Sequence, residues 1–115
     1  MVDINPITLK FWQSATGREP VREWLSAMPI ENRKIMGRDL AKLQFGWPLG
    51  MPLCKSLKDG LWELRSTLPD TTEARILFCF YEGELIALNG FIKKSQATPP
   101  SQLNLARQRK KELKQ

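Results

Sequence analysis

The fold is decided by three apolar runs and the turns between them: Gly60-Leu-Trp-Glu-Leu-Arg65, Arg75-Ile-Leu-Phe-Cys-Phe-Tyr81, and Glu84-Leu-Ile-Ala-Leu-Asn-Gly-Phe91. Each run has the length of a strand and is bounded by turn residues. The run 74–81 is apolar on both faces, which is typical of a central strand. The two-residue Glu82-Gly83 turn predicts a tight hairpin with 84–92. Strands at 61–66, 74–81 and 84–92, joined by short loops, predict an antiparallel sheet.

The flanking segments predict one more strand and three helices. Residues 7–12 alternate apolar and polar side chains, which indicates a first strand. Two segments, residues 21–28 and about 31–45, carry apolar side chains along one side of a helix and therefore predict two helices. Pro20 and Pro29 bound the first, and the glycines and proline of 46–50 end the second. Residues 48–59 are expected to form a loop. A last helix is predicted over 101–114 with Ser101 as its cap. Its thin apolar stripe and many cations predict light docking or a partner-facing arm.

These elements predict one α+β domain over residues 1–115, in the order β-α-α-β-β-β-α. The length of 115 residues fits a single compact domain, and a hydrophobic content of 42% is enough for a core. We expect the first two helices to pack on one face of a small antiparallel sheet and to bury the tryptophans. The other face of the sheet would then stay available for a ligand.

The chain is basic, with 18 Lys and Arg against 12 Asp and Glu and a net charge of +6. An excess of this size favours an anionic partner, which could be nucleic acid, an acidic protein or a membrane surface. An ordinary basic protein is an equally good interpretation of the charge alone. Residues 91–115 hold seven basic residues and one acid, so the excess is concentrated at the C-terminal end.

Several classes of protein are not expected. With no histidine and only Cys54 and Cys79, neither a disulfide framework nor a zinc site is predicted, and no cofactor motif is visible. The N-terminus lacks signal-peptide features, and the longest apolar run, 76–81, is too short to span a bilayer. We therefore expect a cytoplasmic protein without a membrane partner. There is no Ser-His-Asp or Cys-His set, so any RNA cleavage would use a lysine or carboxylate base, or mainly positioning and charge stabilisation.

Cations gather at the ends of the predicted strands. If the loop 67–73 joins its two strands as a hairpin, Arg65 and Arg75 lie near one sheet edge, where they repel each other unless an anion lies between them. A phosphodiester fits, because arginine offers a planar fork of donors. For one arginine alone, pairing with Glu63, Asp70 or Glu73 is the favoured interpretation. Anion binding is favoured for the whole group, which comprises Arg65, Arg75, Lys93, Lys94, Lys55 and Lys58.

Phe91 and Gly90 lie just before the lysine pair. A strict two-residue turn places Gly90 opposite Arg75 and Phe91 near Ala74. Gly90 would leave open space above the sheet for a ligand. Phe91 could then offer its ring for a base to stack on, and a core role for the ring is equally well supported.

The same residues resemble a known family. Gly60-Leu-Trp-Glu-Leu-Arg65, Arg75-Ile-Leu-Phe-Cys-Phe and Phe91-Ile-Lys-Lys-Ser-Gln-Ala-Thr-Pro99, followed by a helix with Ala106 and Arg107, are similar to the HigB-like, phage-related branch of the RelE/ParE toxin superfamily. The resemblance covers nearly the whole chain. It implies a toxin of a type II toxin–antitoxin module, an endoribonuclease that cleaves ribosome-bound mRNA without a metal and uses the RNA 2′-hydroxyl as nucleophile.

The resemblance also implies roles for residues and partners. Arg65 and Arg75 would stabilise the scissile phosphate, and Lys93 and Lys94 would contact phosphate or transfer protons. The implied partners are mRNA, the ribosome and a small antitoxin, usually a helix-turn-helix protein in this branch. No tyrosine or histidine lies near the last helix, so the acid and base stay unassigned. A ParE-like gyrase inhibitor and an inactive nucleic-acid-binding relative are the alternatives. The implied RNA contacts are Lys55, Lys58, Phe91 and Arg107.

Overall fold

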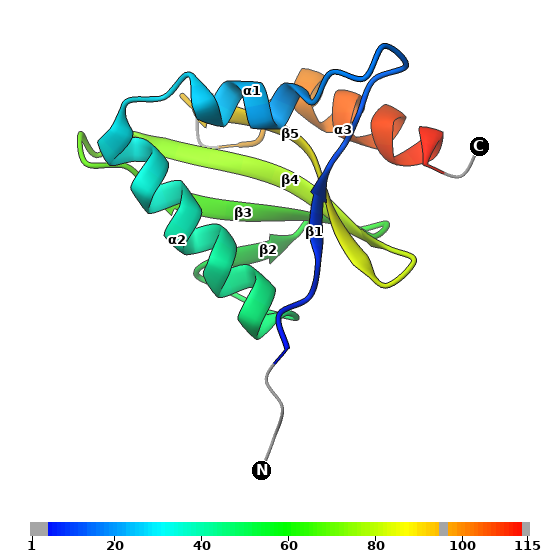
Figure 1. Ribbon diagram of the computed structural model, residues 1–115, viewed down its shortest axis with the longest axis horizontal. Coiled ribbons are helices and arrows are strands. Elements are labelled where there is room, and N and C mark those ends of the chain that lie inside the picture. Colours follow the sequence, from blue (N-terminus) through cyan, green and yellow to red (C-terminus); the bar gives the residue numbers. More distant parts are fainter. Residues whose placement is uncertain (1–4, 95–96, 114–115) are drawn as a thin grey trace.

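The computed structural model describes residues 5–94 and 97–113 (Figure 1). The predicted α+β order is confirmed, with one additional strand. In chain order the elements are β1 (Leu9–Phe11), α1 (Pro20–Ser26), α2 (Ile30–Gly46), β2 (Cys54–Ser56), β3 (Leu61–Thr67), β4 (Glu73–Tyr81), β5 (Glu84–Lys93) and α3 (Pro100–Glu112).

The five strands form one sheet in the order β1-β5-β4-β3-β2. Strand β4 lies in the middle, as its apolar run predicts, and β2 to β5 are antiparallel to their neighbours. Strand β1 pairs with β5 in parallel. The expectation of a loop throughout 48–59 is wrong at β2. That strand has only three residues, two of them exposed, and it is defined by backbone pairing with β3 rather than by an apolar pattern.

The hairpin between β4 and β5 forms as predicted, with Tyr81 opposite Glu84. Glu82 and Gly83 both have positive φ angles, 48° and 81°, as the tight turn requires. Further along, Phe78 pairs with Ala87 but Leu77 pairs with Asn89, so Leu88 is an extra residue in a β-bulge. The bulge shifts the register by one residue. Arg75 therefore lies opposite Phe91, and the prediction that Gly90 lies there is wrong.

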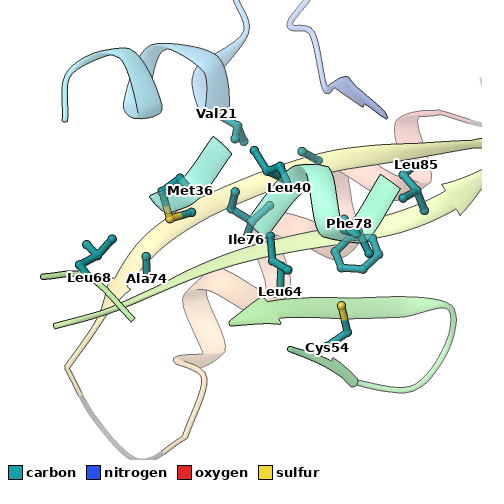
Figure 2. Close-up of a cluster of buried hydrophobic side chains, with 12 residues drawn as sticks. Val21, Met36, Leu40, Cys54, Leu64, Leu68, Ala74, Ile76, Phe78 and Leu85 are labelled. Atoms are coloured by element: carbon teal, nitrogen blue, oxygen red, sulfur yellow. The ribbon is translucent and has the colours of Figure 1, made fainter. Parts of the chain in front are cut away.

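Helices α1 and α2 cover one face of the sheet. Figure 2 shows their buried side chains Val21, Met36 and Leu40 against Ile76 and Phe78 of β4. Helix α1 begins at Pro20, as predicted. Three of the four tryptophans pack against this core, whereas the fourth packs on the opposite face of the sheet. The three are Trp24, Trp47 and Trp62, and the fourth is Trp12.

Helix α3 covers the face that was expected to stay open. Its residue Ala106 is fully buried, and Leu103 and Leu113 pack beside it. The helix begins at Pro100, so Ser101 lies inside it rather than at the cap, and Lys114 lies outside the described residues. The sheet supplies most of the apolar surface in this second core, which comprises Leu61, Leu77, Cys79, Ile86, Leu88 and Phe91.

Polar contacts hold α3 at its beginning, middle and end. Asn89 Nδ2 donates to Gln102, to its carbonyl oxygen at 3.2 Å and to its Oε1 at 2.8 Å. Arg109 Nη1 donates to the carbonyl oxygen of the bulge residue Leu88 at 2.7 Å, and its guanidinium carbon lies 4.4 Å from the ring centre of Trp12. The Tyr81 hydroxyl donates to the Leu113 carbonyl oxygen at 2.6 Å. The expectation of a lightly docked helix is therefore wrong.

Gly90 makes room for Trp24 and not for a ligand. A Cβ atom on Gly90 would lie 2.6 Å from Cε3 of Trp24, closer than carbon atoms pack. The open space expected above Gly90 is thus filled by α1. We expect Gly90→Ala to lower the free energy of unfolding by about 1–3 kcal/mol, because the indole must move. Urea unfolding would measure a smaller cost in a Trp24→Leu background, where the space is free. An equal cost in both backgrounds would contradict this account.

Candidate functional site

Charged residues meet where β3 ends, β4 begins and β5 ends. Thr67, Glu73 and Lys93 form the outermost row of strand partners, and Arg65, Arg75 and Phe91 form the next. Residues directly opposite each other in a sheet share a face, and so do residues two apart. Arg65 and Arg75 are therefore direct neighbours near the end of their two strands, as the hairpin predicts. They share this face with Glu63 and Glu73, and it is the face covered by α3.

Arg75 is fully buried, with 0% of its surface exposed. Its Nη2 donates to Glu73 Oε1 at 2.9 Å, and its Nε lies 3.5 Å from Glu63 Oε1. Glu63 is also buried, and its other oxygen, Oε2, accepts a hydrogen bond from the Thr98 hydroxyl at 2.6 Å. The countercharges of Arg75 are thus protein carboxylates. With 0% of its surface exposed, the guanidinium lies where a phosphate in solvent does not reach it, and its contacts favour a positioning role over the expected direct contact with phosphate.

Glu73 accepts a hydrogen bond from the buried Arg75 and is itself accessible to solvent. Its carboxylate is 49% exposed, and the hydrogen bond from Arg75, followed by the charge of Arg75, lowers its pKa below the usual 4.5. The charges of Lys93 and Arg65 lower this pKa further, so both cations lie within electrostatic reach of Glu73. Glu73 is therefore ionised at neutral pH. A carboxylate with a lowered pKa is a poor general base, so its contribution is mainly electrostatic.

Arg65, unlike its direct neighbour Arg75, is accessible to solvent. Its side chain is 27% exposed, with Nε 3.9 Å from Glu63 Oε1. Strand β2 begins beside Leu64, and the Arg65 amide donates to the Leu53 carbonyl oxygen at 2.8 Å. Beyond Leu64, where the pairing of β3 with β2 ends, lies a cleft of about 550 Å³, called here the Arg65 cleft. It is lined by Arg65, Thr67, Glu73, Arg38, Asp39, Lys42, Pro52 and Leu53.

Arg38 and Lys42 are the residues that the sequence analysis missed. They lie four apart on α2 and therefore point the same way, which is the signal that could have identified them as a pair. Asp39 Oδ1 lies 3.8 Å from Arg38 Nε. Only the tertiary packing of α2 beside β3 shows that the pair lines the same cleft as Arg65. The cleft thus combines three cations with the carboxylates of Asp39 and Glu73.

The predicted lysines take different places. Lys93 ends β5 and is half-buried on the α3 face, and Lys94 lies one residue beyond the strand and is exposed. Neither forms an ion pair in the described part of the chain. Lys55 pairs with Glu63 across β2 and β3, so it lies on the α3 face and is exposed. Lys93 and Lys55 therefore lie on the same sheet face as Arg65, each in a row of strand partners two residues away from it, and Lys94 follows Lys93 beyond the strand.

Lys58 and Arg107 lie at the other end of β3. Lys58 belongs to the turn between β2 and β3, with a φ angle of 73°. Arg107 lines a smaller cavity of about 220 Å³ with Asp59, Leu61, Lys110 and Lys111. These two candidates are not brought to the Arg65 cleft. Phe91 is buried in the α3 core, so its packing supports the core alternative over base stacking.

Three further findings concern the described residues. Among residues 5–94 and 97–113, no three Cys, Asp or Glu side chains are placed to share a metal ion. Within the same residues, no helix has both the length and the apolar character needed to cross a membrane. Cys54 is buried, and burial raises the pKa of its thiol to about 11, which keeps it protonated and unreactive at neutral pH. What the site offers is a set of cations for an anion.

The family model described as phage derived protein Gp49-like (DUF891) matches residues 23–111, from α1 to α3. The chain belongs to this family. Gp49-like proteins are part of the RelE/HigB toxin-like group, which confirms the resemblance at that level. The Gp49-like match includes the whole Arg65 cleft. A search among curated proteins found no match to the chain.

Proposed function

We propose that this Gp49-like chain is the toxin of a type II toxin–antitoxin module and cleaves mRNA on the ribosome without a metal. The observation that carries the proposal is the Arg65 cleft, whose lining combines a partly exposed guanidinium with two cations from α2. An RNA phosphodiester is the anion that suits such a set, because its oxygens accept the paired donors of arginine. Lys93 and Lys94 add positive charge at the same end of the sheet.

The expected chemistry is charge stabilisation while the RNA 2′-hydroxyl attacks the adjacent 3′-phosphate. The P–O5′ bond breaks, which leaves a 2′,3′-cyclic phosphate and a 5′-hydroxyl, and the proton lost by the 2′-hydroxyl is balanced by the proton that the leaving 5′-oxygen gains. Negative charge grows on the phosphate oxygens in the transition state, and cations placed beforehand stabilise that charge more than they stabilise the substrate. Arg65 is the residue we assign to the scissile phosphate, with Lys93, which lies opposite Glu73, as an additional cation at the same end of the sheet. Glu63 Oε1 lies 3.9 Å from Arg65 Nε and 3.5 Å from Arg75 Nε, so one buried carboxylate forms ion pairs with both arginines.

The main competitor is a ParE-like toxin that inhibits gyrase. Binding to gyrase does not require cations grouped around a phosphate, so the cleft favours the RNA substrate. A non-catalytic nucleic-acid-binding protein would use the same cations, with an affinity that falls steeply with salt. Cleavage itself therefore has to be measured.

We expect expression of the wild-type chain to arrest growth and to create new mRNA 5′ ends at codon-spaced positions. Arg65→Ala should lower the cleavage rate by about 10²–10³, the usual loss when one charge-stabilising group is removed from a site. Because Arg65 is partly exposed, its loss should cost less than about 1 kcal/mol of stability. Arg33→Ala, an exposed arginine elsewhere on α2, is the matched control and should leave cleavage unchanged. If plasmid supercoiling falls while mRNA stays intact, gyrase is the target instead.

A further inference from the structure

Large apolar side chains are exposed beside the Arg65 cleft. Phe45 is 59% exposed at the end of α2, and Met51 is 62% exposed in the following loop. They line a second groove of about 550 Å³, called here the Phe45 groove, whose lining is predominantly apolar. Exposed apolar surface gathered in one concave place is typical of a binding site. Phe45, Gly46, Leu49, Gly50, Met51, Pro52, Leu53 and Lys42 form it.

The Phe45 groove and the Arg65 cleft are continuous. Lys42, Pro52 and Leu53 line both of them. Lys42 therefore belongs to both hollows, and Arg38 and Arg65 line the cleft. An occupant that fills the groove with apolar groups comes to lie next to three cations. Carboxylates on the same occupant would be attracted to these cations.

The lining of the groove selects the kind of occupant. Lys42 is the only one of its residues with a polar side chain. A nucleobase placed there would leave most of its polar edge without hydrogen bonds, which is costly. Leucine-like side chains have no such edge. A flat membrane surface does not enter a concave groove, whereas the apolar face of a folded segment does.

We infer that the Phe45 groove binds an acidic amphipathic segment of a partner protein, with apolar side chains against Phe45 and Met51 and carboxylates at Lys42, Arg38 and Arg65. If the proposed toxin function holds, this partner is the antitoxin. Because the two hollows share Lys42, Pro52 and Leu53, its carboxylates would occupy the place of the RNA phosphate. Neutralisation would then be direct competition at the Arg65 cleft.

A phage-displayed library of random peptides, selected on the full chain, tests the inference. The enriched peptides should combine apolar residues on one face with Asp or Glu. Their Kd should rise about tenfold or more for Phe45→Ser and for Lys42→Glu, as for residues central to an interface. Ile30→Ser and Arg33→Glu are the matched controls, because Ile30 is 56% exposed and Arg33 is exposed on the same helix, nine residues before Lys42 and so turned away from it. Both controls should change Kd less than about twofold.

Several outcomes would overturn the inference. In the peptide selection, these are no enrichment, enrichment of basic peptides, or a loss of peptide affinity with Ile30→Ser equal to the loss with Phe45→Ser. Flotation of the chain on phosphatidylglycerol vesicles, if Phe45→Ser abolishes it, would indicate a membrane surface instead. RNA crosslinks at Phe45 would indicate a nucleic acid in the groove. A labelled RNA oligonucleotide separates this inference from the proposed function. If the peptides bind as expected but the chain neither binds nor cleaves RNA, the docking site stands and the nuclease proposal fails. If RNA is cleaved but peptide binding ignores Phe45, the docking site fails and the nuclease proposal stands.

Discussion

Arg75→Ala is expected to lower the free energy of unfolding by about 3–5 kcal/mol, a large part of the total stability of a small domain. The guanidinium is fully buried and lies between the carboxylates of Glu63 and Glu73. Removing it leaves Glu63 charged, buried and without its main countercharge, in addition to a cavity under α3. Urea unfolding followed by circular dichroism measures the loss. A loss of toxicity in this variant would therefore report missing folded protein rather than a missing catalytic group.

Two variants separate the buried charge from the lost volume. Arg75→Met combined with Glu63→Leu removes both charges and keeps an apolar side chain at each place, so it should recover most of the stability lost in Arg75→Ala. Arg65→Ala removes the neighbouring arginine, which is 27% exposed, and should cost much less. If Arg75→Ala and Arg65→Ala proved equally stable, the buried ion pair would not be the stabilising element described above.

The sheet could be predicted from the sequence because its signals are local. The apolar run at 74–81 and the Glu82-Gly83 turn fix the central strand and its hairpin within a few residues of each other. The bulge at Leu88 has no comparable signal, and it moved Phe91 to the position expected for Gly90. Strand β2 gave no signal either, because a three-residue edge strand depends on its neighbour for hydrogen bonds.

The candidate site could be predicted only in part, because it depends on tertiary packing as well as on local sequence patterns. The strand pairing that brings Arg65 and Arg75 together follows from the hairpin. Which arginine is neutralised depends on burial and on side-chain direction, and these are set by α3 and by the carboxylates of Glu63 and Glu73. Arg38 and Lys42 reach the cleft from a helix far away in the sequence. A basic pattern therefore indicates an anion site, but tertiary packing decides which cations a ligand can reach.

Helix α3 shows most directly how a sequence pattern can understate packing. Its few apolar residues suggest light docking, yet they cover an apolar sheet face that includes Leu77, Leu88 and Phe91. Hydrogen bonds that no periodicity reveals complete the attachment, such as the one from Arg109 to the bulge carbonyl of Leu88. Burial of the Arg109 guanidinium lowers its pKa below the ordinary value, although an arginine stays charged at neutral pH. This basic residue serves the fold and not a ligand.

Deleting residues 100–115 is therefore expected to abolish cooperative folding, and not only to weaken RNA binding. The deletion exposes the second core to water and leaves the Leu88 carbonyl and the Asn89 amide without their helix partners. Thermal unfolding should lose its sharp transition, and the dye anilinonaphthalene sulfonate should bind to the exposed apolar surface. Arg107→Gln with Lys111→Gln is the matched control, because it removes exposed charge from α3 and leaves Ala106 and Arg109 in place. That variant should stay within about 0.5 kcal/mol of the wild type. A truncated chain that melts at the wild-type temperature would show that α3 contributes charge alone.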